Sequence, residues 1–553
     1  MNRSSERCWR GGSGNRRMSS NWLAIVVALS LIVGAPHGGA AQSLDVGDSR
    51  EALLRLWQLT GDAALNSFSL RPLVSREDEA IDGAGAGPWA NPFVLEPLFA
   101  SSGVEITPLE ARLRSFVNTG HPVGANDGVV WQGRGVTAAL DLGTTLSWRG
   151  LRVTAKPTIV FAQNRAFDLA TVEVAGMPDY AYPWRRIDLP QRFGPESFWT
   201  LDPGQSEVRV SGYGATGGFS TRNLWWGPGI NSAILMSNNA GGLPHAFLGT
   251  RGPRSIGIGT VEANWIWGRM KQSDYFDPSV EIDDRYLTGL VVAYSPSFLQ
   301  GLSIGFTRVF YGWVPEDGLP LSDLFLVLQG IEKEDLESPE NPTGNDERDQ
   351  LVSLFARWVF PASGFEVYGE WARNDHPLNF YDILLEPEHS QGYTLGFQKA
   401  IAIPGDRRVS FRGELTHLER EATFRLRASP VYYAHHLVTQ GYTHGGQGVG
   451  AAVGPGGIQQ FLGADLYAAW GRTGLFLQRR VTDNDAYYAW AERNDVSFDN
   501  HDVSIDIGSS ATWFVRELEI GAGLTYTRQL NRYFYGPNVN NFNIQASARW
   551  SLH

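Results

Sequence analysis

The sequence predicts an all-β fold, a transmembrane antiparallel β-barrel that follows a small N-terminal helical segment. The chain begins with a secretory signal, and no later window holds the roughly 18 continuous apolar residues of a membrane-spanning helix. Instead, apolar and polar residues alternate in segments of about ten residues, as in the strands of outer-membrane barrels. The net charge of −12 and the hydrophobic content of 42% fit either a soluble exported protein or such a barrel. The alternation favours the barrel.

The first 41 residues are typical of a secretory signal. Arg16–Arg17 supply the positive charge, Trp22–Val33 the apolar core, and Gly39–Ala41 the small residues before the cleavage site. The mature chain then starts near Gln42. The single cysteine, Cys8, precedes the apolar core, so the mature chain has no thiol. This excludes a lipid-anchored N-terminus, disulfides, cysteine metal sites and thiol catalysis.

Residues 42–125 are predicted to form a small helical segment or plug. Ser49–Thr60 has the spacing of an amphipathic helix, with leucines and a tryptophan on one face. Thr107–Val117 is expected to form a second helix, because Thr107 suits the N-cap and Pro108 the first helical position. A frayed amphipathic extension is the alternative for this segment.

Residues 126–553 carry the strands of the predicted barrel. Apolar residues alternate over Val136–Trp148, and a turn at Arg149–Gly150 leads into a returning strand. The same pattern recurs in Val352–Phe360 with a turn at Pro361–Gly364, Leu466–Trp470 with a turn at Gly471–Gly474, Val503–Trp513 with a strand from Leu518, and Phe542–Leu552. The chain ends in His553 rather than in the usual aromatic residue. We expect about 16–18 strands, and an even number for a bacterial single-chain barrel.

Five segments carry a resemblance to a known family. They are Arg222–Gly229 with Ser237–Asn239 and Pro244, Asn126–Gly135, Tyr368–Glu370 with Gly392–Phe397, Pro430–His436 with Gly441–Tyr442 and Gly446–Gln447, and Arg532–Tyr535 to Trp550. Together they resemble the Wzi family of capsule-assembly proteins, outer-membrane barrels that hold capsular polysaccharide on the cell surface. The resemblance implies roughly 18 strands, with a small helical bundle at the periplasmic end of the barrel.

Aromatic platforms and hydroxyl partners predict a polysaccharide site in these segments. Indole and phenol faces stack on pyranose rings, while amide and imidazole groups bond the hydroxyls. We expect these roles in the lumen or its mouth for Trp225 and Trp226 as platforms, Asn238 and Asn239 as hydroxyl partners, and His435, His436 and Tyr442 beside them. The alternative is structural, since barrel tryptophans commonly form interfacial girdles and polar lumen residues often bond to one another.

The charge pattern adds a second indication of an acidic ligand. Almost all positive charges are arginines, whose planar forks suit uronate or phosphate groups of capsule or lipopolysaccharide. A genome rich in G and C would produce the same bias. The acidic run Glu332–Asp349 is expected to be a solvated loop, because its spacing fits no calcium loop.

Two apparent catalytic motifs are set aside. Gly212–Gly217 fits a dinucleotide pattern and Gly301–Gly305 a nucleophile elbow, but both lie in strand patterns without the helix that either motif needs. The adjacent histidines at 435 and 436 lack the spacing of a metal site on a helix.

We therefore predict a non-enzymatic lectin in the outer membrane of a Gram-negative bacterium. It is expected to retain capsular or related exopolysaccharide, without cofactor, metal or nucleic acid, and to be a monomer that contacts outer-membrane lipids including lipopolysaccharide. Two alternatives remain open. One is a porin-like channel for sugars or small solutes, and the other is an outer-membrane enzyme that modifies lipid or glycan.

Overall fold

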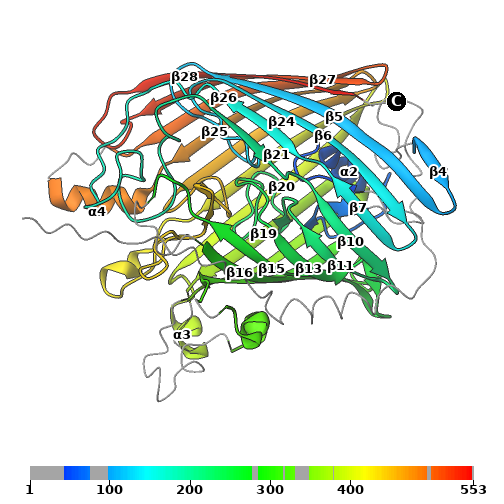
Figure 1. Cartoon of the computed structure of the whole chain (residues 1–553), viewed down its shortest axis with the longest axis horizontal. Coiled ribbons are helices and arrows are strands. Elements are labelled where there is room, and N and C mark those ends of the chain that lie inside the picture. Colours follow the sequence, from blue (N-terminus) through cyan, green and yellow to red (C-terminus); the bar gives the residue numbers. More distant parts are fainter. Residues whose placement is uncertain are drawn as a thin grey trace, which may run out of the picture.

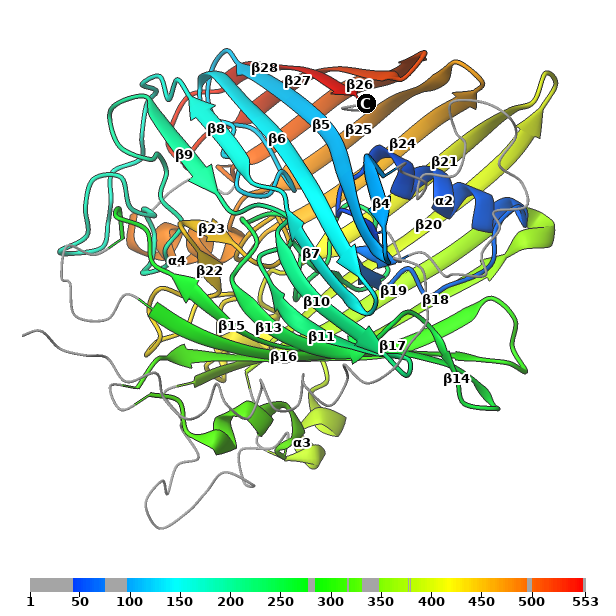
Figure 2. The same ribbon diagram turned by 45° about the vertical axis from the view of Figure 1, so that its right-hand side comes forward.

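The computed structural model describes residues 43–74, 97–276, 284–315, 318–330, 348–375, 377, 379–494 and 500–550. This part of the chain forms a closed antiparallel barrel of 18 strands (Figures 1 and 2), which confirms the predicted fold class. The last strand, β28, closes the barrel by pairing with β5, from Asn543 opposite Asn118 to Trp550 opposite Ala111. The predicted signal and most of the acidic run lie outside the described residues.

The wall strands follow one another around the barrel in chain order. Three of them are interrupted. β7 and β8 both pair with β6, β10 pairs with β7 and β9 with β8, and β13 and β14 both pair with β15. The wall consists of β5 (Val104–Asn118), β6 (Gly135–Trp148), β7 (Leu151–Ala155), β8 (Thr158–Ala162), β9 (Phe198–Asp202), β10 (Glu207–Gly212), β11 (Ala215–Ser220), β13 (His245–Thr250), β14 (Arg254–Ser255), β15 (Gly259–Lys271), β16 (Asp284–Pro296), β17 (Leu302–Trp313), β18 (Arg348–Phe360), β19 (Phe365–Asn374), β20 (Gln391–Ile403), β21 (Arg407–His417), β24 (Ile458–Ala468), β25 (Gly471–Val481), β26 (Val503–Val515), β27 (Leu518–Leu530) and β28 (Val539–Trp550), with the short β4 (Phe99–Ser101) beside β5.

The two ends of the barrel differ in the length of their connections. At one end, here the short-turn end, tight turns such as Arg149–Gly150 and Arg516–Glu517 join the strands. At the other, the long-loop end, connections such as 163–197 and 418–457 are far longer. These connections contain η1 (Leu321–Leu328), α3 (Phe380–Leu385), η4 (Ala422–Arg425), β22 (Thr443–His444), β23 (Gln447–Gly448) and α4 (Asn484–Asn494). Outer-membrane barrels place short turns in the periplasm and long loops outside the cell.

The outer surface of the wall is apolar, and most of its inner surface is polar. On β26, Ile507 is 59% exposed, whereas the neighbouring Asp506 is buried and faces inward. Leu475 and Leu477 of β25 are exposed in the same way. This is the inverse of a water-soluble β protein, and it is the pattern of a wall that contacts lipid. None of the helices in the described residues is long and apolar enough to cross a membrane.

The strand predictions are largely confirmed. The hairpins β6–β7, β18–β19 and β26–β27 form where the alternation predicts them, and β28 covers the alternating C-terminal segment. The predicted turn at Gly471–Gly474 is wrong by a few residues, because β24 ends at Ala468 and these four residues already belong to β25. Gly212–Gly217 spans the β10–β11 hairpin and Gly301–Gly305 leads into β17, so neither forms the motif that it resembles.

The first predicted helix is confirmed as α2 (Ser49–Thr60). Asp48 is its N-cap and accepts the N–H of Arg50 at 2.9 Å, while Gly61 ends it with φ of 79°. In Figure 2 the helix lies inside the barrel at the short-turn end. Its apolar face, which includes Leu56 and Trp57, packs against Val359, Ala400 and Tyr467 of the wall. Burial of this face fixes α2 in the lumen.

The second predicted helix is wrong, since Thr107–Val117 lies within the wall strand β5. A β-bulge explains the error: Leu109 pairs with Gly143 but Arg112 with Asp141, so two residues of β5 stand opposite one of β6. The extra residue shifts the alternation by one position and leaves a spacing that imitates a helical face. The barrel therefore begins at Val104 rather than at residue 126.

Candidate functional site

The tryptophan pair forms part of a plug in the lumen, by which we mean the loops 221–244 and 418–457 that fill the barrel interior. Trp225–Trp226 are strand β12, which pairs with β2 (Leu70–Arg71) of the N-terminal segment. The Trp225 ring is 3% exposed, and the guanidinium of Arg71 lies over it, 4.3 Å from the ring centre. Trp226 is 1% exposed and packs in the luminal core. Both rings are covered by protein, so their faces are not open to a sugar in this structure.

An apolar core fills the lumen around Trp226. The loop between β11 and β13, residues 221–244, supplies Ile234 and Leu235, and the loop between β21 and β24 supplies Tyr432 and Tyr433. Wall residues from β16 to β18 complete the core, among them Val291, Val309 and Leu351. A barrel wall is normally polar inside, so this apolar lining indicates a wall built to hold a plug.

Two wall carboxylates anchor the loop 221–244. Glu414 of β21 accepts the N–H groups of Ile230 at 2.7 Å and Asn231 at 3.0 Å, together with the hydroxyl of Tyr368 at 2.7 Å. Glu370 of β19 accepts the N–H of Ile234 at 3.1 Å. These contacts satisfy backbone donors that a buried loop would otherwise leave unpaired.

The predicted hydroxyl partners hold the plug together. The Asn238 amide donates to the carbonyl of Asn126 at 2.8 Å, and the Asn239 amide donates to the carbonyl of Gly448 at 3.2 Å. Asn126 in turn donates to the carbonyl of Asn231 at 2.9 Å. Residues from four of the five family-like segments thus contact one another in this plug.

The remaining three candidates lie in the loop 418–457. Tyr442 is fully buried and donates its hydroxyl to the carbonyl of Leu235 at 2.7 Å. The ring nitrogen Nδ1 of His435 accepts the N–H of Val438 at 3.1 Å and stabilises a turn. His436 is exposed, with its ring 4.6 Å from that of His435. Of the seven predicted residues, His436 is thus the one on the exposed surface.

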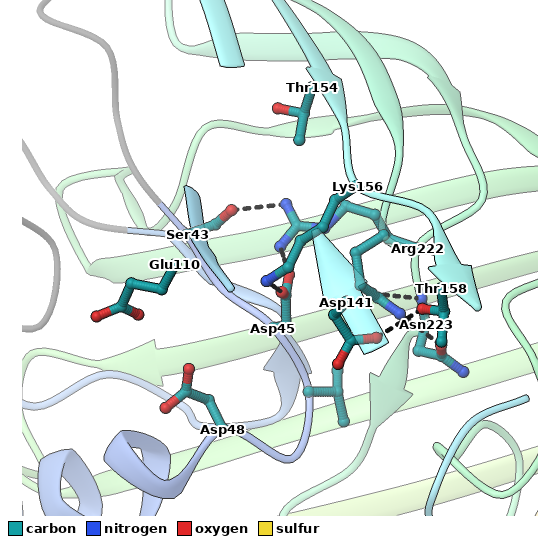
Figure 3. A network of polar contacts seen from close by, with 12 residues as sticks. Ser43, Asp45, Asp48, Glu110, Asp141, Thr154, Lys156, Thr158, Arg222 and Asn223 are labelled. Atoms are coloured by element: carbon teal, nitrogen blue, oxygen red, sulfur yellow. Dashed lines mark hydrogen bonds and ion pairs between the residues drawn. The ribbon is translucent and has the colours of Figure 1, made fainter. Parts of the chain in front are cut away.

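A charged cavity of about 280 Å³ lies between this plug and the wall, towards the short-turn end. Its floor is the segment before α2, where Lys156 and Arg222 converge on Asp45 at 2.6 and 2.5 Å (Figure 3). Arg222 also donates to the hydroxyl of Ser43 at 2.6 Å. Burial opposes ionisation of Asp45, but the two cations outweigh it and lower its pKa to about 2.

A second group of charges borders the same cavity. Asp48 accepts both Arg50, at 2.8 Å, and Arg549, at 3.0 Å, while Glu110 accepts Arg50 at 2.8 Å. Burial opposes ionisation of Asp48, but Arg50 and Arg549 outweigh it and hold the pKa of this carboxyl well below its usual range. Glu51 has a weaker partner, Arg71, at 3.8 Å, and burial raises its pKa to about 7.

The long-loop end carries an aromatic cluster that sequence reasoning missed. Trp184, Trp490 and Tyr535 come from three separate loops, with ring centres between 5.7 and 6.4 Å apart. Phe534, which is buried, lies 4.9 Å from Trp184 and supports the cluster. Tyr535 is 47% exposed, and the two tryptophans are half-buried. α4, which carries Trp490, lies at the opposite end of the barrel from α2 (Figure 1). The only sequence signal was the segment Arg532–Tyr535, which gave no indication of its partners.

The sequence profile of the capsule assembly protein Wzi family matches residues 205–483, which is half of the chain. The chain belongs to the Wzi family. The match covers β10 to β25, and therefore both loops that form the plug. This confirms the family that the sequence segments resemble. The closed barrel with an apolar outer wall is the architecture of an outer-membrane protein.

One solved structure shares the fold, and others match with lower scores. Escherichia coli Wzi, described as an outer membrane protein involved in group 1 capsule assembly and as a carbohydrate-binding β-barrel, matches with a TM-score of 0.61 and 14% identity over 93% of this chain and 100% of that chain. Acinetobacter baumannii OccAB1 matches with a TM-score of 0.40 and 9% identity over 83% and 99% of the two chains. Pseudomonas putida OprB gives 0.36 and 12% over 81% and 94%. No curated protein sequence matches this member of the Wzi family. Within the described ranges, no cluster of three His, Cys, Asp or Glu side chains could hold a metal ion.

Proposed function

We propose that this protein binds capsular or related exopolysaccharide and retains it at the cell surface, as a non-enzymatic member of the Wzi family. The observation that carries the proposal is the filled lumen. An apolar core built from two loops occupies the barrel interior, and Trp226 and Tyr442 are buried within it. A diffusion channel for sugars requires a polar, water-filled lumen instead. Escherichia coli Wzi, which is described as carbohydrate-binding, supports the same role.

The aromatic cluster at the long-loop end is the contact surface that we propose for the polysaccharide. Trp184, Trp490 and Tyr535 are held by one another and by Phe534. Binding of a ligand to these rings therefore costs little side-chain conformational entropy. Exposed polar residues stand close to them in the sequence, including Arg186 and Asn538. A fixed apolar platform with polar groups at its rim suits the two faces of a sugar ring. Trp225, Trp226, Asn238, Asn239, His435 and Tyr442 act on this site indirectly, by holding the plug that supports the loops, whereas His436 is free to contact glycan.

The apolar outer wall is expected to contact the lipids of the outer membrane. Because a single chain closes the barrel, a monomer is sufficient for the proposed function. Lipopolysaccharide is the expected neighbour at the long-loop end, because that end faces outside the cell. The proposed function needs no cofactor.

The test uses a capsule-producing host in which the gene is deleted and then replaced by variants. We expect deletion to release polysaccharide into the medium without reducing total synthesis. The double variant W490A/Y535A should reproduce much of this loss, since stacking contacts are worth about 1–3 kcal/mol, a few-fold to a hundred-fold in affinity. W148A is the matched control, because Trp148 is an exposed tryptophan at the short-turn end. Unchanged cell-bound capsule in the deletion strain would contradict retention.

A second measurement distinguishes retention from transport. The purified wild-type barrel should show no steady conductance in planar bilayers, because the plug fills the lumen. Steady single-channel conductance would favour the porin-like alternative.

A further inference from the structure

One arginine of the luminal cavity has no protein partner. Among the described residues, Arg112 of β5 makes no hydrogen bond and no ion pair, although it lines the cavity. On the inner wall Arg112 stands between Arg549 on β28 and Asp141 on β6, and Asp141 is paired with Arg114, two residues further along β5. The nearby carboxylates Asp48 and Glu110 are occupied by other arginines.

The β-bulge of β5 places Arg112 in the lumen. Before the bulge, Thr107 and Leu109 border a cavity, and after it Arg112 and Arg114 do, so the inward-facing positions change from odd to even numbers. Without the extra residue, the arginines would face the lipid. Bulges commonly redirect side chains near functional sites. Here the bulge turns an arginine pair towards a cavity.

The cavity also contains polar atoms that lack a partner. Arg114 pairs with Asp141 through its terminal nitrogen at 3.3 Å, but its Nε is buried without a hydrogen bond. The side-chain oxygen of Asn126 is likewise buried without one. Such buried atoms destabilise the fold unless a ligand or water satisfies them. One donor on β5 and one acceptor in the loop between β5 and β6 therefore belong to residues that line the cavity of Arg112.

We infer that this cavity binds one hexuronate residue, with its carboxylate on the guanidinium of Arg112. A guanidinium binds a carboxylate through two parallel hydrogen bonds. The amides of Asn126, Asn223, Asn238 and Gln545 line the same space and suit the sugar hydroxyls. Its volume of about 280 Å³ is at the lower limit of ligand pockets, about 300–1,000 Å³, and so admits a single ring.

The ligand reaches this site from the short-turn end. A second cavity of about 140 Å³ shares Asp48 and Glu110 with the first and borders Glu105 and Ser147, close to the short-turn ends of β5 and β6. The site is thus on the periplasmic side of the plug, apart from the aromatic cluster on the opposite end. Its occupation does not depend on retention of polysaccharide at the surface.

Isothermal titration calorimetry on the purified full barrel in detergent, at low ionic strength, tests the inference with sodium glucuronate. We expect R112Q to weaken binding at least ten-fold. R112K keeps the charge but not the planar fork, so we expect a smaller loss of several-fold. R528Q is the matched control with unchanged affinity, since Arg528 is a half-buried wall arginine near the long-loop end, away from the cavity. Unaltered melting of each variant in detergent establishes that it is folded.

Comparison of ligands completes the test. Glucose and sodium acetate should each bind far more weakly than glucuronate, because glucose lacks the carboxylate and acetate lacks the ring hydroxyls. Tighter binding of trigalacturonate than of galacturonate supports a chain end as the source of the residue, and weaker binding supports a free sugar. Wild-type affinity in both R112Q and R112K overturns the inference. So does glucose or acetate binding as tightly as glucuronate. Neither result bears on capsule release from cells.

Discussion

The Asp45 carboxylate and the Lys156 ammonium group lie 2.6 Å apart, which joins the N-terminal segment to the wall between β7 and β8. The other oxygen of Asp45 accepts Arg222 at 2.5 Å, at the start of the plug loop. One carboxylate therefore connects three parts of the chain that are far apart in sequence: the segment before α2, the wall and the plug.

We expect D45N to destabilise the barrel at neutral pH. Because the two cations lower the pKa of Asp45 from 3.8 to about 2, the folded state holds the charged form more strongly than the unfolded state does. This stabilisation is present above pH 3.8 and is lost as the pH falls towards 2, with a size of about 2 kcal/mol. Thermal unfolding of D45N in detergent should show a lower melting temperature at pH 7.

The pH dependence checks the cause of this effect. At pH 2 the wild type and D45N should melt at nearly the same temperature, because the wild-type carboxyl is then about half protonated and most of its stabilisation is lost. K399M, which removes a half-buried lysine of β20 that donates to the carbonyl of Ser363, should melt like the wild type at both pH values. A deficit of D45N that is equal at pH 7 and pH 2 would argue against the ion pairs as its origin.

W226A should loosen the plug and open a path through the lumen. The Trp226 ring packs closely against β16, since a Cβ atom on Gly289 would lie 2.9 Å from it. Replacing the ring by a methyl group therefore leaves an empty space beside the wall. Removing a buried tryptophan costs about 3–5 kcal/mol. The variant should unfold at lower denaturant and show conductance in planar bilayers that the wild type lacks. W148A removes a lipid-facing tryptophan and should show no conductance. A silent W226A barrel would mean that Trp226 does not seal the lumen.

The wall was the most predictable part of the fold, because its physics is local. Each strand repeats an apolar-out, polar-in pattern that can be recognised within about ten residues, and hairpins such as β26–β27 formed where that pattern placed them. β5 was the exception. Its bulge between Leu109 and Arg112 breaks the alternation, and Thr107–Pro108 then imitates a helix start.

The site was less predictable, because it depends on contacts between distant segments. The segment 222–244 is unusual in sequence, but nothing in it shows that Arg71 covers Trp225 or that Leu235 accepts the hydroxyl of Tyr442. Aromatic residues with the composition of a sugar site proved to be buried in a plug. The exposed cluster of Trp184, Trp490 and Tyr535 combines three loops that no local spacing connects.

E414A should release the plug loop without disrupting the wall. Glu414 accepts two backbone N–H groups, from Ile230 and Asn231, and its removal leaves both donors unpaired inside the barrel. Each unpaired buried donor costs about 1–3 kcal/mol. Limited proteolysis should then cut within residues 221–244, where the wild type resists. E492A, which changes an exposed glutamate of α4, is the control. Resistance of E414A equal to that of the wild type would show that the loop is held by its apolar packing alone.

E51Q should stabilise the protein at alkaline pH. Glu51 is 6% exposed, its Oε2 accepts the N–H of Gly47 at 2.9 Å, and its Oε1 is buried without a partner. Burial raises its pKa from 4.5 to about 7 against the pull of Arg71, so the folded state binds the proton more tightly than the unfolded state does. The resulting stability is complete below pH 4.5 and is lost as the pH rises through 7, by about 2–3 kcal/mol. Melting curves in detergent should show the wild type weakening between pH 5 and 8 and E51Q holding steady over that range. The control variant E492Q should lose stability between pH 5 and 8 as the wild type does. Parallel pH profiles for E51Q and the wild type would show that Glu51 stays charged in the folded barrel and that Arg71 fully compensates its burial.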